Sequence, residues 1–185
     1  MKKFLLLLIF LVFSFVGFSQ ETQWQTVKNT EMAYRIDFPG EATGKSQDVP
    51  TEKGSVKMYS YQFQPINDVN LIYMSSFTEY PQSFFLDGIS SLEDQTKLLD
   101  GSVSGAVTNT KGTLISDEKI VFNGYNGREV AISIGYDAVS YIITMRIVLV
   151  NFRIYIAQVI AEKGKEDNLE RSRFFNSFEL IKVKQ

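Results

Sequence analysis

The chain has 185 residues, 19 of them basic and 21 acidic, and it contains no histidine and no cysteine. The absence of these two residue types excludes Ser-His-Asp and Cys-His mechanisms and removes the preferred ligands of zinc, copper and haem. The mild acidic balance argues against a nucleic-acid partner, because binding to a phosphate backbone needs clustered lysine and arginine.

The N-terminal segment has the pattern of a secretory signal peptide. Lys2 and Lys3 form a short positive region, and an apolar run follows from position 4 to position 18. Gly17 and Ser19 then supply the small residues that a signal peptidase requires. We therefore predict that residues 1–19 are a signal peptide and that the chain is exported.

Cleavage is expected between Ser19 and Gln20, which leaves a periplasmic or secreted protein. An uncleaved anchor is the alternative, but the apolar run has 15 residues, whereas a spanning helix needs about 20. Residues 20–185 are predicted to form a single domain with no stable membrane span. This domain keeps 17 basic and 21 acidic residues, hence a net charge of −4.

The first half of the chain predicts strands. We expect Trp24 to make the first ordered contact and a polar loop to lead to Pro50. Alternation of apolar and polar side chains, bounded by turn residues, predicts strands at 32–38, 56–63 and 70–77. The short connection between the last two predicts a hairpin.

A helix is predicted next, because four apolar residues recur with helical spacing: Phe85, Ile89, Leu92 and Leu99. Ser83 is the expected N-cap, Lys97 favours the C-terminal end, and Gly101 can take the left-handed position after the last turn. Residues 102–111 are rich in Ser, Gly, Thr and Asn, which predicts a loop or a frayed helix end.

The second half predicts four strands, a helix and a final strand. The four strands are 113–122, 128–134, 139–150 and 153–161, with turns at Asn123-Gly124, Asn126-Gly127, Gly135 to Asp137 and Asn151-Phe152. Strand 139–150 is apolar on both faces, which predicts a central position with cover on each side. A helix is expected at 165–176, and a strand at 178–183 closes the chain.

This order of elements predicts an α+β fold, an antiparallel β-sheet with helices packed on its faces. Adjacent strands with short connections argue against a parallel Rossmann arrangement. Four short segments in the same order support the prediction: Tyr34 to Pro39, Gly124 to Glu129, Arg153 to Tyr155, and Phe174 to Phe178.

These segments resemble the Mog1/PsbP-like superfamily of small bacterial envelope proteins. The resemblance spans most of residues 31–183. The resemblance implies an α/β/α sandwich built on an antiparallel sheet. The bacterial members mostly have no assigned activity, while plant members assist the oxygen-evolving photosystem and eukaryotic members bind a small GTPase. A histidine-dependent metal role of some plant members does not transfer, because this chain has no histidine.

The same segments also have a structural interpretation. Gly124 and Gly127 are predicted to serve turns, and Arg128 and Glu129 to form an exposed ion pair on a strand, worth about 0–1 kcal/mol. Three aromatic residues are predicted to lie in the core: Phe174, Phe175 and Phe178.

No residue is predicted to be catalytic, cofactor-binding or metal-binding. Carboxylates could in principle bind Ca²⁺, but Asp117-Glu118 and Glu166-Asp167 lack the spacing of an EF-hand loop and are expected to be solvated. No glycine-rich phosphate loop follows a strand and opens a helix. A carboxylate-based enzyme therefore ranks third among the functional interpretations.

Two hypotheses rank above it. The first is an exported non-enzymatic accessory or protein-interaction module of the bacterial cell envelope, with an envelope protein as partner. The alternative is a binder of a small apolar or amphipathic ligand in a pocket between sheet and helices, since 14% of the residues are aromatic.

Overall fold

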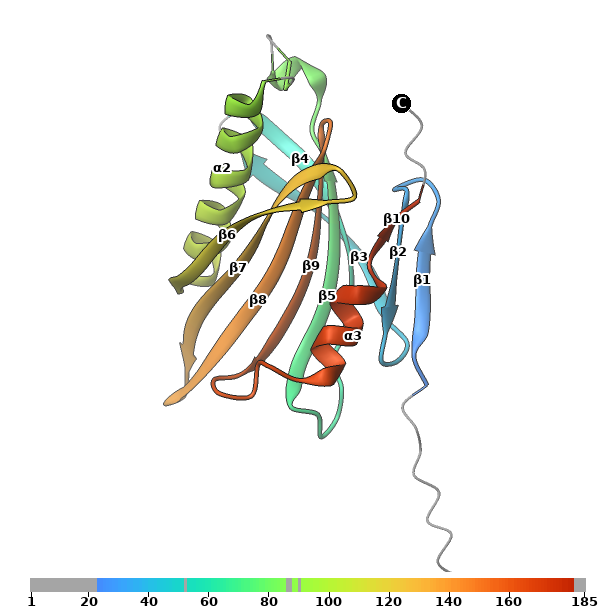
Figure 1. Ribbon diagram of the computed structural model, residues 1–185, viewed down its shortest axis with the longest axis vertical. Coiled ribbons are helices and arrows are strands. Elements are labelled where there is room, and N and C mark those ends of the chain that lie inside the picture. Colours follow the sequence, from blue (N-terminus) through green and yellow to red (C-terminus); the bar gives the residue numbers. More distant parts are fainter. Residues whose placement is uncertain (1–22, 52, 86–87, 90, 182–185) are drawn as a thin grey trace, which may run out of the picture.

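The computed structural model describes residues 23–51, 53–85, 88–89 and 91–181 (Figure 1). The predicted signal peptide and its cleavage site lie outside these residues, as does the end of the predicted strand 178–183. Within the described ranges, ten strands form two antiparallel sheets, and two α-helices and a 3-10 helix accompany them. The predicted α+β fold is confirmed.

The larger sheet has seven strands, and every neighbouring pair is antiparallel. In spatial order its strands are β3 (Thr43–Thr51), β4 (Gly54–Phe63), β5 (Asn70–Glu79), β9 (Arg153–Glu162), β8 (Val139–Val150), β7 (Tyr125–Tyr136) and β6 (Thr113–Phe122). Strand β8 lies inside the sheet and has a buried side chain on both faces along most of its length, as its sequence predicted.

The smaller sheet has three strands in the order β1 (Gln25–Asn29), β2 (Tyr34–Phe38) and β10 (Glu179–Leu180). The sequence predicted a single sheet, so this second sheet is a correction. It arises because the two ends of the chain both pair with β2: Thr26 lies opposite Asp37, and Glu179 lies opposite Arg35.

The helices cover opposite faces of the larger sheet (Figure 1). Helix α2 (Leu92–Thr110) packs on β7 and β8, and its buried residues Leu99 and Val103 join the apolar cluster on that face. On the other face, α3 (Leu169–Ser177) and the small sheet enclose a second cluster with Phe38 and Phe174. The result is the expected α/β/α layering, with the small sheet as an addition beside α3.

The first helix begins later and ends later than predicted. Ser83 lies in the 3-10 helix η2 (Gln82–Phe84), and the N-cap of α2 is Ser91, whose side chain accepts a hydrogen bond from the Asp94 amide. Gly101 lies inside the helix, and Lys111, with φ of 51°, takes the left-handed position at its end. The polar segment 102–111, predicted as a loop or a frayed helix end, is regular helix as far as Thr110.

Three further predictions need correction. Strand β3 replaces the expected polar loop before Pro50. The second helix starts at Leu169 instead of position 165, because Asn168 accepts the capping hydrogen bond from the Arg171 amide at 2.8 Å. Asn126-Gly127 lies within β7 and is not a turn, whereas Asn123 and Gly124, with φ of 51° and 86°, do form the β6–β7 turn.

Candidate functional site

Four consecutive residues of β7, at positions 126–129, contact helix α2 on one face of the sheet and strand β8 on the other. The Nδ2 atom of Asn126 donates a hydrogen bond to Gln95 of α2 at 2.7 Å. Arg128 also contacts α2, whereas Glu129 points to the opposite face and contacts β8. Between them, Gly127 is buried, and a Cβ atom there would overlap the backbone oxygen of Ile147. Gly127 thus permits close packing of strands and does not serve a turn, which corrects the prediction.

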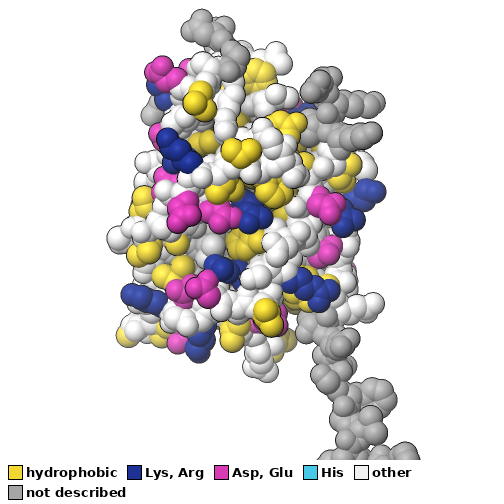
Figure 2. Space-filling model, in the orientation of Figure 1, with side chains coloured by type: hydrophobic (Ala, Val, Ile, Leu, Met, Phe, Trp, Pro, Cys, Tyr) yellow, Lys and Arg dark blue, Asp and Glu magenta, His cyan; other side chains and the backbone are white. Residues whose placement is uncertain are grey.

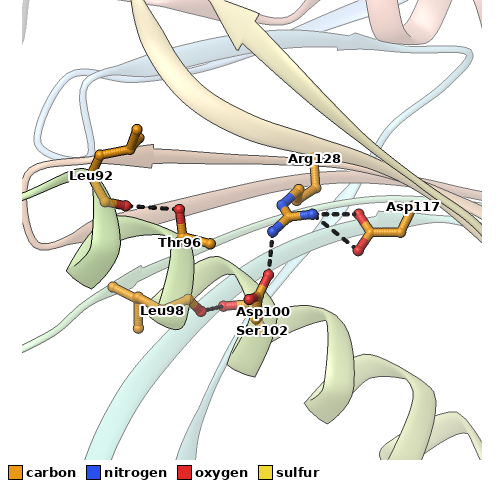
Figure 3. Close-up of polar contacts among 7 residues, drawn as sticks. All are labelled: Leu92, Thr96, Leu98, Asp100, Ser102, Asp117 and Arg128. Atoms are coloured by element: carbon orange, nitrogen blue, oxygen red, sulfur yellow. Dashed lines mark hydrogen bonds and ion pairs between the residues drawn. The ribbon is translucent and has the colours of Figure 1, made fainter.

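Arg128 is a buried cation held by two carboxylates (Figure 3). Its side chain is 7% exposed, and its Nη1 atom donates to both carboxylate oxygens of Asp117 on β6, at 3.2 and 3.1 Å. Its Nη2 atom donates to Asp100 of α2. The guanidinium therefore joins the edge strand, its neighbour and the helix.

The predicted ion pair between Arg128 and Glu129 does not exist. Successive side chains of a strand point to opposite faces, so neighbours in sequence cannot pair in this way. Glu129 instead accepts hydrogen bonds from Nε and Nη2 of Arg146, at 2.9 and 2.5 Å. Asp117, predicted to be a solvated charge, is the partner of Arg128.

Arg146 is fixed on the α3 side of the sheet by polar and aromatic contacts. Its Nη1 atom donates to the backbone oxygen of Phe175 at 3.0 Å, close to the C-terminal end of α3. The guanidinium carbon lies 5.4 Å from the ring centroids of both Phe122 and Phe175, a cation–π arrangement. With Glu129 as its carboxylate, Arg146 has little freedom to reorient.

A polar groove lies beside Arg146, between α3 and strands β6 to β8. It consists of two adjoining hollows of about 160 and 270 Å³, which share Glu129, Thr144 and Arg171 in their linings. The larger hollow reaches the edge strand β6 at Ile115, Ser116 and Glu118. We call this the α3 groove. Figure 2 shows acidic and basic side chains close together on this face.

The second predicted acidic pair belongs to the α3 groove. Glu166 and Asp167 line its larger hollow, and Asp167 pairs with Arg171 at 2.8 Å while remaining 87% exposed. Glu166 and Asp167 therefore lie near other charges, although Asp167 is solvated as predicted. The groove unites Glu118, Glu129 and these two residues, which are far apart in the sequence.

A separate hollow of about 290 Å³ lies between the β1–β2 turn and the face of β3 and β4. Met32, Tyr59 and Tyr61 line it together with small polar residues. The Tyr61 hydroxyl accepts a hydrogen bond of 3.4 Å from Asn29 of the small sheet. This hollow is more aromatic than the α3 groove.

Among the residues that the structure describes, no three Asp or Glu side chains lie together in a way that could hold a metal ion. In the same part of the chain, no helix is both long enough and apolar enough to cross a membrane.

The fold is PsbP-like. The sequence matches no protein-family model and no curated protein. Among solved structures, the cyanobacterial PsbP protein (CyanoP) from Synechocystis is similar with a TM-score of 0.54 and 12% identity, over 90% of this chain and 96% of that chain. The predicted resemblance is thereby confirmed at the level of the fold.

Two further structures are similar over less of their length or with lower scores. A protein from Bacteroides thetaiotaomicron has a TM-score of 0.47 and 11% identity, over 86% of this chain and 49% of that chain. A protein of unknown function from Pseudomonas aeruginosa has a TM-score of 0.40 and 5% identity, over 65% and 85% of the two chains.

Proposed function

We propose that this chain is an exported, non-enzymatic accessory module of the bacterial cell envelope, and that it binds a protein partner through the α3 groove. The export pattern of residues 1–19 supports the location. The PsbP-like fold supports an accessory role, because the solved structures similar to this chain include the cyanobacterial PsbP protein, and some members of the resembled superfamily assist a larger complex.

The α3 groove is the observation that carries this proposal. Pockets for small ligands are mostly concave and apolar, whereas this groove is open and combines apolar side chains with charged ones of both signs. Glu129 and Arg146 hold each other in a fixed geometry, so a partner meets a preformed polar surface. Among the strands that the structure describes, β6 lies at the edge of the sheet beside the groove, where it offers backbone groups to an extended partner segment.

Export is tested by fractionation of the bacterial cells that produce the full chain. We expect the protein in the periplasm or the medium, with a mature N-terminus at Gln20 identified by mass spectrometry of the N-terminal peptide. Recovery from the cytosol with Met1 to Ser19 still attached would contradict the location while leaving the groove untouched.

Partner binding is tested by site-specific photo-cross-linking in the same cells. A photoreactive residue at Ser116, in the α3 groove, should give a discrete cross-linked product. The same residue at Lys97, exposed on α2 at the other face, serves as the control. The change Glu118→Lys should abolish the product, whereas Glu41→Lys, at an exposed position outside the groove, should leave it. Equal cross-linking from Ser116 and Lys97 would contradict the proposal.

The alternative function, a binder of a small apolar or amphipathic ligand, rests on the hollow formed by Met32, Tyr59 and Tyr61. Native mass spectrometry of protein purified from its own cells tests it. A bound small molecule that is lost with Tyr61→Ala and retained with Glu118→Lys would favour this alternative over the α3 groove.

A further inference from the structure

The β6–β7 region contains two Asn-Gly dipeptides in very different surroundings. Asn123-Gly124 forms the tip of the hairpin, and both residues are exposed. A Cβ atom built at Gly124 would meet no atom within 4 Å outside its chain neighbours, so no other segment covers this side of the turn. Asn in a turn and Gly after it are the least hindered residues for attack on the asparagine side chain.

Asn126-Gly127 has the same chemical sequence but lies in the sheet. Asn126 pairs with Val121, and Gly127 pairs with Ile120 on one side and Val148 on the other. The Asn126 amide also donates to Gln95 at 2.7 Å. Reaction at this site would require the strand to leave the sheet.

We propose that Asn123 is a site of spontaneous deamidation, and that the fold protects Asn126 from the same reaction. This inference is independent of the proposed function. The contrast between an accessible turn and a paired strand carries it, since the two sites share their residue types and lie on one hairpin.

The reaction needs only water. The backbone nitrogen of Gly124 attacks the side-chain carbonyl carbon of Asn123, a C–N bond closes a succinimide ring, the side-chain amide C–N bond breaks, and ammonia leaves with the proton of the attacking nitrogen. Water then opens the ring at either carbonyl and gives aspartate or isoaspartate. A neutral side chain thereby becomes negative, next to Phe122, whose ring stacks on Phe178 at 5.1 Å.

The two sites can be compared within one peptide. Trypsin cleaves after Lys119 and Arg128, so residues 120–128 are released together with both asparagines. The purified full chain is kept at mildly alkaline pH, and fragment masses of this peptide report deamidation at each position over time. In the folded chain we expect Asn123 to react at least about tenfold faster than Asn126, because Asn126 must wait for local opening of the sheet.

Two controls keep the comparison decisive. In urea, where the sheet is absent, the two rates should become similar. Asn123→Ser should remove the reaction at the tip and leave the slow rate at Asn126 unchanged. Equal rates in the folded chain would overturn the inference. The inference would also be overturned if Asn123 stayed intact in the folded chain over a period in which it is deamidated in urea.

Discussion

The burial of Arg128 determines which change in its ion cluster costs the most stability. Its side chain is 7% exposed, whereas those of Asp117 and Asp100 are 24% and 56% exposed. Removing both carboxylates would leave a buried guanidinium without a counter-charge. Removing the arginine would leave two carboxylates that can still reach water.

We therefore expect the double change Asp100→Ala with Asp117→Ala to lower the free energy of unfolding by about 3–5 kcal/mol, the cost of an unpaired buried charge. Arg128→Met should cost less, because its apolar side chain fills part of the same space. Urea denaturation of both variants measures the difference. Asp48→Ala, which breaks the exposed pair with Lys57, is the control and should have little effect. A larger loss for Arg128→Met would contradict this explanation.

The buried tyrosines make the fold sensitive to alkali. Burial raises the pKa of Tyr34 to about 12, although its hydrogen bond with Ser75 acts in the opposite direction. Burial likewise raises the pKa of Tyr155 to about 12. An unfolded tyrosine releases its proton near pH 10, so the unfolded chain binds fewer protons than the folded chain above that pH. The contribution of Tyr34 to stability is complete below about pH 10 and is lost as the pH rises through about 12.

For Tyr34 this contribution amounts to about 2–3 kcal/mol. Urea denaturation at a series of pH values should show a steady loss of stability from about pH 10 upward. Phenylalanine cannot ionise, so Tyr34→Phe should reduce the loss of stability with rising pH. Tyr136 is 69% exposed, and Tyr136→Phe should leave that loss unchanged. An unchanged slope in Tyr34→Phe would contradict the assignment.

At the scale of elements, the two helices depend on caps of different importance. Ser91 caps α2 with a hydrogen bond of 3.1 Å at an exposed position. Asn168 caps α3 and also exchanges two hydrogen bonds, of 3.0 and 2.9 Å, with the fully buried Asn70. The cap of α3 is thus linked to the interior of β5.

Ser91→Ala should therefore lower the free energy of unfolding by about 1 kcal/mol, the usual value of an N-cap. Asn168→Ala should cost about 2–4 kcal/mol, because the cap is lost and the side-chain oxygen of the buried Asn70 loses its donor. Chemical denaturation followed by circular dichroism compares the two variants. Equal losses would show that the link to Asn70 contributes nothing.

The elements that the sequence predicted well are those with one clear periodicity. Strands β6 and β8 have the predicted bounds, and the hairpin of β4 and β5 forms as expected. Strand β3 was missed because it is an edge strand with mostly exposed side chains, so it carries no alternating apolar pattern. Helix α2 was misplaced because Phe85 and Ile89 continue its apolar spacing by coincidence, although both precede Ser91.

The site was harder to predict than the fold. The sequence singled out the segment from Gly124 to Glu129, and the structure shows that this segment contacts α2 directly and α3 through Arg146. Its actual partners are distant in sequence. The strand register brings Asp117 and Arg146 to the segment, and the packing of α2 on β7 brings Asp100. Alternation along the strand was the available signal, since it separates Arg128 from Glu129.

At the scale of the whole molecule, Trp24 reports on how the small sheet is attached. Its ring lies 6.3 Å from that of Tyr73 on β5, and the Arg173 guanidinium of α3 lies 4.3 Å from it. Strand β2 also contributes Tyr34, Ile36 and Phe38 to the cluster on the α3 side of the larger sheet. The two sheets therefore share one apolar core.

This shared core predicts a single cooperative unfolding transition. The chain has one tryptophan, so fluorescence of Trp24 follows the small sheet while far-ultraviolet circular dichroism follows mainly the larger one. The two urea midpoints should coincide. An earlier fluorescence transition, in a chain that retains its circular dichroism, would show that the small sheet detaches on its own.

The pairing of β2 with both ends of the chain constrains when the molecule can be completed. Tyr34 and Arg35 cannot pair until residues 180 and 179 have been made. Likewise, Phe38 cannot pack against Phe174, whose ring lies 5.2 Å away, until that residue has been made. A polypeptide emerges from the ribosome N-terminus first, so β2 is made long before residues 174–180 emerge. One side of the core therefore stays open until residues 174–180 have left the ribosome.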